Sequence, residues 1–140
     1  MSLERFCRKP VISAGPTDPI AQVASLMREK HVGTVVIVDG SRRPVGIVTD
    51  RDIACRLVAE GLDPVTTPAR AVMTQPAATV PRTSTIEQVS MLMRQRGVRR
   101  LPVVDGEDKL IGFVALDDLT MLFVAELGLL VGAVRDNQGP

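Results

Sequence analysis

The sequence predicts an α/β (α+β) fold made of two β-α-β-β-α repeats related by a pseudo-twofold axis. Three observations lead to this prediction. The chain repeats its own pattern without a gap, so that Pro10 corresponds to Pro76 and Asp52 to Asp118, an offset of 66 positions. Each copy carries a helix-start signal, and each then has two short apolar runs split by an Asp-Gly turn.

The composition agrees with close-packed aliphatic layers. Of 140 residues, 45% are hydrophobic, yet the chain has no Trp and no Tyr, so Val, Ile, Leu, Ala and Met must build the core. The 17 basic and 16 acidic residues leave a net charge of +1, which argues against the broad positive surface of a nucleic-acid or membrane-surface binder. We therefore expect no nucleic acid and no membrane as partner, and any anion site must be local.

The first helix of each copy is marked by its start. In the first copy we expect Asp18 as the N-cap and Pro19 at the first helical position, followed by apolar residues at helical spacing. In the second copy Ser84 and Glu87 predict a capping box before Ile86. A short extended stretch precedes each helix, at residues 11–14 and 77–80.

A hairpin and a second helix complete each copy. The hairpins are predicted from TVVIVDG followed by PVGIVT, and from RRLPVVDG followed by LIGFVA. The most apolar stretch of the chain is 119–134, which Glu126 interrupts and which is shorter than the ~20 residues of a membrane-spanning helix. We expect a helix there that is either buried or paired, and the same apolar surplus could form an oligomer contact.

The chain shows no signature of an enzyme or a metal protein. It contains no pair of nucleophile and base and no Gly-rich phosphate loop. Cys7 and Cys55 belong to no Cys-x-x-Cys or Cys/His cluster, which argues against zinc and for a reducing compartment, the cytoplasm. We expect both thiols to be small core residues. The first ten residues lack the apolar segment of a secretory signal.

The junction between the first hairpin and its second helix admits two interpretations. Thr49 and Asp52 could form a capping box, with the carboxylate near the positive end of the helix. The same carboxylate could instead accept hydrogen bonds from both hydroxyls of a ribose, as acidic residues do in dinucleotide folds. Thr49 would then add a hydroxyl beside it. The second copy keeps Asp118 but has Ala115 where the first has Thr49.

These junctions carry a family resemblance. The run apolar-Pro-Val-Val-Asp-Gly, followed after a short loop by Gly-Ile-Val-Thr-x-x-Asp, resembles the cystathionine-β-synthase (CBS) domain, and two in tandem resemble a Bateman module. Val72-Met73-Thr74 also matches the family's usual opening, whereas Phe6-Cys7-Arg8 departs from it. We accordingly expect one CBS motif at 5–61, a linker at 62–70, a second motif at 71–126, and a C-terminal helix extension and tail at 127–140.

The resemblance implies a regulatory module without a required cofactor. Such modules bind AMP, ADP, ATP, S-adenosylmethionine or in some cases NAD between the paired motifs, and two modules pair into a flat homodimer. In the family, one motif's Thr-x-x-Asp faces the first strand of the other motif. One cleft would therefore combine Thr49 and Asp52 with Ala78, Thr79 and Val98. The opposite cleft would combine Asp118 with Ile12, Ser13 and Val32, and we expect it to be weaker or empty because it lacks the hydroxyl.

The anionic part of such a ligand needs a cation. Arg99 and Arg100 occupy positions where the family often has His or Arg against phosphate, and a planar guanidinium binds phosphate oxygens in pairs. They could serve either cleft, or they could be solvated surface residues.

Two functions remain open from the sequence. The first is a non-catalytic sensor that binds an adenine nucleotide and reports to an unidentified regulated protein. The second is a dimeric adaptor with vestigial clefts, in which the apolar segment 119–134 carries the function.

Overall fold

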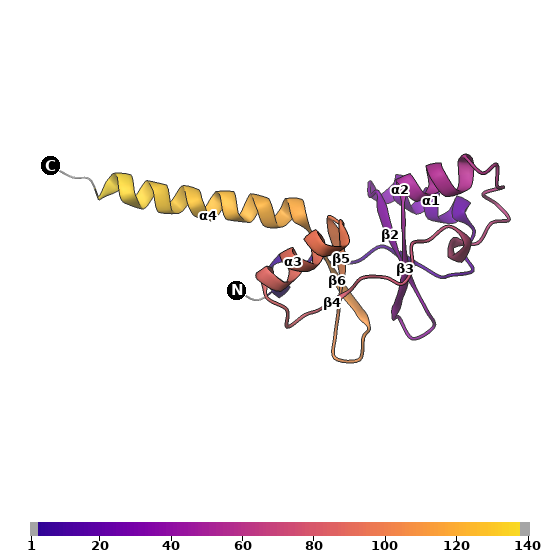
Figure 1. The fold of residues 1–140 in the computed structure, drawn as a ribbon, viewed down its shortest axis with the longest axis horizontal. Coiled ribbons are helices and arrows are strands. Elements are labelled where there is room, and N and C mark those ends of the chain that lie inside the picture. Colours follow the sequence, from indigo (N-terminus) through magenta and orange to yellow (C-terminus); the bar gives the residue numbers. More distant parts are fainter. Residues whose placement is uncertain (1–2, 138–140) are drawn as a thin grey trace.

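The computed structural model describes residues 3–137 and confirms the doubled architecture (Figure 1). The first repeat contains η1 (Leu3–Phe6), β1 (Ser13–Ala14), α1 (Ile20–Lys30), β2 (Thr34–Val38), β3 (Pro44–Thr49), α2 (Asp50–Asp52) and the π-helical segment η2 (Ile53–Val58). The second repeat contains η3 (Ala69–Ala71), β4 (Val80–Pro81), α3 (Ile86–Arg96), β5 (Arg100–Val104), β6 (Leu110–Ala115) and α4 (Leu116–Asp136).

The two repeats form separate three-stranded sheets with the same topology. The strand orders are β1-β2-β3 and β4-β5-β6, with the first pair of strands parallel and the second antiparallel in each sheet. The registers also agree, since Val36 pairs with Ile47 and, 66 positions later, Pro102 pairs with Phe113. The repeat seen in the sequence is therefore a repeat of hydrogen-bonded structure.

The leading segment of each repeat, before its first strand, lies along the last strand of the other repeat. The Arg8 N–H donates to the Phe113 carbonyl at 2.8 Å, and the Thr74 N–H donates to the Ile47 carbonyl at 2.8 Å. Arg8 and Thr74 are equivalent in the repeat, as are Ile47 and Phe113. The exchange therefore follows the pseudo-twofold relationship, and each half supplies part of the other.

Two glycines make room for this exchange. A Cβ atom at Gly46 would overlap the side chain of Met73, and a Cβ at Gly112 would lie 2.6 Å from the Cys7 sulfur. Both glycines belong to the sequence pattern that marks the repeat. Their absent side chains let the crossing segment lie flat on the strand.

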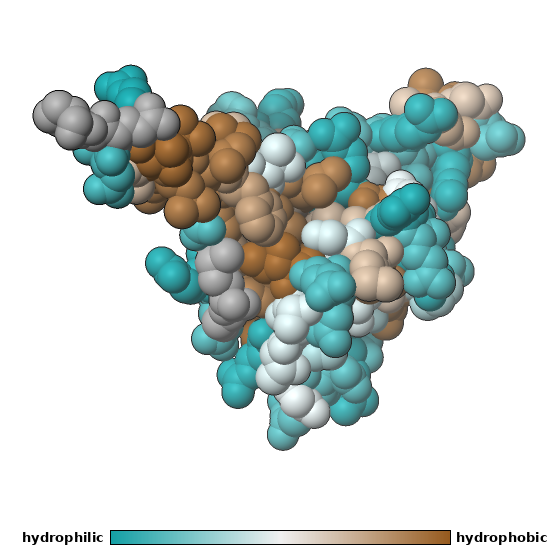
Figure 2. Space-filling model, turned by 60° about the vertical axis from the view of Figure 1, so that its left-hand side comes forward, coloured by the Kyte–Doolittle hydropathy of each residue, from teal (hydrophilic) through white to brown (hydrophobic). Residues whose placement is uncertain are grey.

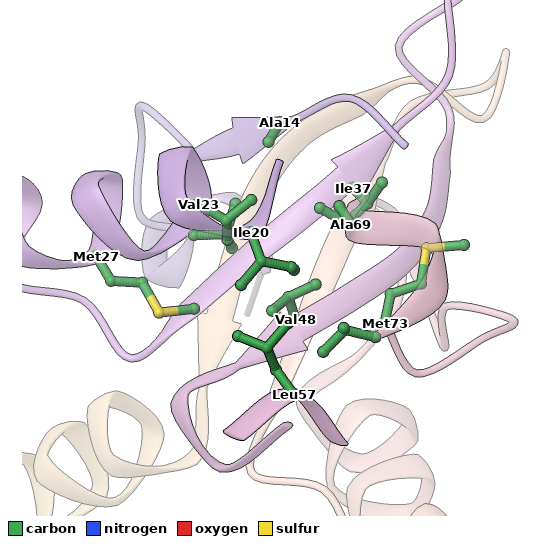
Figure 3. Packing of buried hydrophobic residues seen from close by; sticks show 11 residues of the cluster. Ala14, Ile20, Val23, Met27, Ile37, Val48, Leu57, Ala69 and Met73 are labelled. Carbon is green, nitrogen blue, oxygen red and sulfur yellow. The ribbon is translucent and has the colours of Figure 1, made fainter. Parts of the chain in front are cut away.

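Each repeat has its own aliphatic core. In the first, side chains from α1 and from β2 and β3 point toward one another (Figure 3). Buried there are Ala14, Ile20, Val23, Met27, Val35, Ile37, Val48, Leu57, Ala69, Val72 and Met73. The second core includes Leu3, which is fully buried although it belongs to the leading segment of the first repeat. Because Leu3 corresponds to Ala69, the exchange of leading segments extends into both cores.

The predicted N-cap at Asp18 is wrong. The N-cap of α1 is Pro19, without a side-chain hydrogen bond, and the Asp18 carboxylate instead accepts the Gly15 N–H at 2.7 Å. The N–H groups at the start of α1 are satisfied from the connecting segment, because Ile20 donates to the Thr67 carbonyl at 3.0 Å and Ala21 to that of Pro64 at 2.9 Å. Backbone carbonyls distant in sequence thus replace a capping side chain as acceptors for the first N–H groups of α1.

The capping box of α3 lies one residue later than predicted. Thr85 and Gln88, rather than Ser84 and Glu87, form it: the Gln88 N–H donates to the Thr85 hydroxyl at 3.2 Å, and the Thr85 N–H donates to Gln88 Oε1 at 2.9 Å. The Ser84 N–H donates to the Pro81 carbonyl, so Ser84 belongs to the preceding turn. The expected extended stretches 11–14 and 77–80 are also shorter, with two residues in each of β1 and β4.

The apolar stretch 119–134 is helical, as predicted, but it is not buried. It forms most of the 21-residue helix α4, and only Leu119 of that helix is buried. Figure 1 shows α4 running out from the second repeat into open space. Pairing of this helix stays a prediction. The last three residues of the expected C-terminal segment, 138–140, lie outside the described residues.

Candidate ligand site between the two repeats

The first strand-to-helix junction contains the capping box that one of our two interpretations requires. The Asp52 N–H donates to the Thr49 hydroxyl at 3.1 Å, and the Thr49 N–H donates to Asp52 Oδ2 at 3.0 Å. The capping interpretation is confirmed. The capping box does not use all the acceptor positions of the Asp52 carboxylate, because its two oxygens offer about four.

The remaining contacts of Asp52 are long. The Thr74 hydroxyl lies 3.5 Å from both carboxylate oxygens, and Arg56 Nε lies 3.8 Å from Oδ1. The Arg56 side chain is held elsewhere, since its Nη1 donates to the carbonyls of Val72 and Met73 at 3.2 and 3.1 Å. Asp52 Oδ1 therefore retains acceptor capacity, although its side chain is only 12% exposed.

The second junction is built differently. No side chain caps α4 at Ala115, and the Asp118 carboxylate accepts two hydrogen bonds from Arg8, at 2.6 Å from Nε and 2.5 Å from Nη2. These hydrogen bonds raise the pKa of Arg8 above its ordinary value. Arg8 corresponds to Thr74 in the repeat, so the same position carries a full ion pair at one junction and a weak hydroxyl contact at the other.

Arg99 is also engaged at this junction. Its Nη2 donates to Asp117 Oδ1 at 2.7 Å, with both side chains exposed. The hydrogen bond from Arg99 holds the pKa of the Asp117 carboxyl below its ordinary range. Of the two arginines expected to meet an anion, Arg99 thus already has a carboxylate partner within its own repeat.

A cavity of about 170 Å³ opens between the repeats. One wall comes from the first repeat, where the segment before β1, the turn after α1 and the start of β2 contribute. The other comes from the start of β5, the end of β6 and the start of α4. The lining residues are Arg8, Pro10, Val11, Ile12, His31, Val32, Gly33, Thr34, Val36, Arg100, Phe113, Ala115 and Asp117. This is the cleft that the sequence assigned to Asp118.

The cavity brings together some of the expected site residues and leaves out others. Ile12, Val32 and Arg100 line it; Asp118 is not in the lining but binds Arg8, which is. Ser13 is in β1, paired with Val36. The cavity does not include Thr49, Asp52, Ala78, Thr79 or Val98, which we predicted for the opposite cleft. Ala78 and Val98 pack against the second core.

Two basic residues of the cavity, Arg8 and His31, were not among the predicted site residues. Arg8 was noticed only as a departure from the family opening, and its partner Asp118 is 110 positions away. His31 is the C-cap of α1, in a left-handed conformation with φ 54°. The repeat could have pointed to His31. It corresponds to Gly97, the C-cap of α3, which directly precedes the predicted site residues Val98 and Arg99.

The charges around the cavity favour an anion over a metal ion. Arg8 and Arg100 bring two guanidinium groups to its lining, while the one acidic side chain, Asp117, is paired with Arg99. Within residues 3–137 no group of three or more His, Cys, Asp or Glu side chains could hold a metal ion. In the same range no helix has the length and apolar character needed to cross a membrane.

Comparison with known proteins agrees with this architecture. The family model of the CBS domain matches residues 3–59 and again 69–125. An uncharacterised protein of Methanopyrus kandleri, MK0525, is 39% identical over 119 residues, which are 85% of this chain and 61% of that protein. The CBS domain protein PAE2072 from Pyrobaculum aerophilum, solved in complex with AMP, is 29% identical with a TM-score of 0.77, over 85% of this chain and 90% of that one.

A second solved structure is the CBS domain pair of the protein MJ0100, in complex with 5-methylthioadenosine and S-adenosyl-L-methionine. It is 25% identical with a TM-score of 0.78, and the match covers 88% of this chain and 99% of that one. Both repeats are matched by one family model, and the fold agrees over the 85–88% of this chain that the two structures cover. This chain therefore belongs to the CBS-domain family and contains two CBS domains in tandem.

Proposed function

We propose that this protein is a non-catalytic regulatory module that binds an adenosine-containing ligand between its two CBS domains. The ligand is an adenine nucleotide, AMP, ADP or ATP, or alternatively S-adenosylmethionine. The observation that carries the proposal is the cavity between the domains, with an apolar wall from Ile12 and Val32 and a guanidinium from Arg100. It is supported by the adenosine ligands in the complexes of PAE2072 and MJ0100.

The two clefts offer unequal chemistry. On the cavity side both oxygens of Asp118 accept hydrogen bonds from Arg8, so a ribose would have to share these oxygens with that arginine or displace it. On the other side Asp52 and Thr49 are held by their capping box but Asp52 keeps acceptor capacity. We therefore assign the tighter ribose site to Asp52 with Thr49, Ala78, Thr79 and Val98, and a weaker site to the cavity.

The clefts also differ in the charge available to a phosphate. Asp117 lines the cavity, and its counterpart in the repeat is Arg51. By this relationship the Asp52 cleft has a cation where the cavity has an acid. Arg100 faces the cavity, and Arg99 is available to a ligand only after it leaves Asp117.

The output of such a module passes to another protein. A ligand shifts a conformational equilibrium only through different affinity for the two states, with couplings of ~1–3 kcal/mol. We infer a regulated partner protein and a cytoplasmic setting, in keeping with the free thiols of Cys7 and Cys55.

Asp52 and Asp118 form a matched pair for testing the proposal. Calorimetric titration with AMP, ADP, ATP, NAD and S-adenosylmethionine should give heat with at least one ligand. Asp52→Ala should weaken the tighter site by roughly 10- to 100-fold, since hydrogen bonds to charged groups contribute ~1.5–3 kcal/mol. Asp118→Ala should leave that site unchanged. The melting temperature of each ligand-free variant controls for the lost cap.

The alternative function is a ligand-free dimeric adaptor. The exposed apolar surface of α4 favours it, because that surface needs no ligand to recruit a partner. If none of the five compounds produced heat or raised the melting temperature, the proposal of a nucleotide sensor would be wrong and the adaptor would take its place.

A further inference from the structure

Helix α4 is longer than its repeat requires. In the first repeat the corresponding helical segment ends at Val58, which is equivalent to Val124. Residues 125–136 therefore have no counterpart, and the family match ends at residue 125. Figure 1 shows this extension pointing away from both sheets. The CBS fold does not need these residues for its core.

The extension is nonetheless strongly apolar. The large apolar residues of α4 beyond Leu119 are mostly well exposed, between 48% for Phe123 and 77% for Leu129. They are Met121, Phe123, Val124, Leu127, Leu129, Leu130, Val131 and Val134. Figure 2 shows a large apolar area at the end of the molecule from which this helix projects. A helix with two glycines, Gly128 and Gly132, and no partner would be marginal in water.

Part of this surface has the spacing of a helix-pairing seam. Residues Leu116, Thr120, Phe123, Leu127, Leu130 and Val134 follow one another at alternating steps of four and three, the a and d positions of a heptad. Val124 and Val131 flank this seam on one side. A shallow hollow on the helix is lined by Leu127, Leu130, Val131, Val134 and Arg135. Leu129 is equally apolar but lies off the seam.

We propose that α4 pairs with α4 of a second copy of this chain, antiparallel, along the seam. In this register Leu127 packs against Leu130 of the second copy, and Phe123 packs against its Val134. In an antiparallel pair, the residue numbers of facing residues add up to a constant, which is 257 for both pairs. The polar Thr120 then meets Asn137 at each end. Because the contact is isologous, the same apolar stripe on each copy packs against that of the other copy. The antiparallel arrangement also opposes the two helix dipoles and keeps the domain bodies at opposite ends.

The area agrees with a dimer. Six side chains on the seam and its flank are 48–65% exposed: Phe123, Val124, Leu127, Leu130, Val131 and Val134. A fully buried aliphatic side chain removes roughly 60–120 Å² of apolar surface, so these six supply roughly 300 Å² per copy. Two copies together bury about 600 Å² of apolar surface. If about 65% of the interface area is apolar, the whole interface buries about 1,000 Å², which is the lower bound for a specific contact.

A lipid surface fits the helix less well. Interfacial helices carry Lys or Arg on their polar face, and α4 has only Arg135, near its end. Its other charged residues, Asp117, Asp118, Glu126 and Asp136, are acidic and would be repelled by anionic lipid.

Sedimentation equilibrium across the micromolar range tests the pairing. Leu130→Glu should halve the mass of the assembly, whereas Leu129→Glu, a matched change at a more exposed site off the seam, should leave the mass unchanged. Neither residue contributes to a core, so both variants should keep the melting temperature of the CBS domains. The ligand plays no part in this experiment, so its result does not depend on the proposed nucleotide binding.

The register has its own test. Phe123→Lys and Val134→Glu should each halve the mass, while the double variant should restore it, because each Lys then faces a Glu of the second copy. In a parallel pair Lys would face Lys, and no restoration would occur; that result would overturn the antiparallel register. A chain whose mass is insensitive to Leu130→Glu would overturn the pairing itself, as would a monomer that co-sediments with phosphatidylglycerol vesicles.

Discussion

Arg8 donates two hydrogen bonds to Asp118, at 2.6 and 2.5 Å, at the position where the equivalent junction has only the Thr74 hydroxyl, 3.5 Å from Asp52. Two positions that the repeat makes equivalent thus differ by a whole charge. Because the two junctions share their fold and their backbone register, this difference in charge distinguishes the two carboxylates that we propose as ribose ligands.

Exchange of these two residues should exchange the properties of the clefts. We expect Arg8→Thr to release Asp118 and strengthen ligand binding at the cavity by up to about fivefold, since an exposed ion pair is worth ~0–1 kcal/mol. Thr74→Arg should weaken binding at Asp52 by a similar factor. Calorimetric stoichiometry and affinity for both variants check this. An unchanged cavity affinity in Arg8→Thr would contradict a competing role for Arg8.

The exchanged segments make Gly112 sensitive to substitution. A Cβ at Gly112 would lie 2.6 Å from the Cys7 sulfur, so Gly112→Ala should lower the free energy of unfolding by ~1–3 kcal/mol through overpacking. Cys7→Ala removes that sulfur. In urea unfolding, the double variant should therefore lose less than the sum of the two single variants. Additive losses would show that the sulfur is not the obstacle.

Asp117 should titrate below the ordinary range of an aspartate. Its pKa is lowered by the hydrogen bond from Arg99, so the pair stabilises the fold above the ordinary aspartate pKa of ~3.9 and stops doing so as the pH falls through the lowered value. Arg99→Ala should move the pKa upward. Carboxyl carbon shifts followed by NMR against pH measure both, and the Asp105 carboxyl, whose pKa the N–H groups of Lys109 and Glu107 lower, should not respond.

The two thiols should differ in reactivity. Cys55 is exposed, contrary to our expectation of a core residue, whereas Cys7 is half-buried and burial raises the pKa of its thiol. Since the thiolate is the reactive form, iodoacetamide should modify Cys55 first and Cys7 slowly at neutral pH. Mass spectrometry of peptides taken over time would reveal this order. Equal rates would mean that the segment carrying Cys7 leaves β6 readily.

The parts of the fold that follow from local pattern were predictable. The offset of 66 positions anticipated the matching sheets, and the Thr49–Asp52 spacing anticipated a capping box. The N-cap of α1 was not predictable in this way, because the carbonyls of Thr67 and Pro64 that replace a capping side chain arrive from the linker. At α3 two neighbouring hydroxyls, Ser84 and Thr85, could both cap, and only the turn at Pro81 decides between them.

The candidate site was predictable only in part, for a related reason. Ile12, Val32 and Arg100 could be assigned to the cleft region through the family pattern, and they line the cavity. The partners of Asp118 and Arg99 could not, since an ion pair between exposed side chains leaves no trace in periodicity. The exposure of α4 was equally hidden, because an apolar helix has the same pattern whether its own domain or another molecule covers it.

The reciprocal placement of Leu3 in the second core and of Ala69 in the first means that neither half is a self-sufficient folding unit. Two separate half-length chains would have to find each other before either could close its interior. Tethering them turns that bimolecular encounter into an internal one, at an effective concentration on the order of millimolar. The packing of the two cores against each other's leading segments then does not depend on the protein concentration.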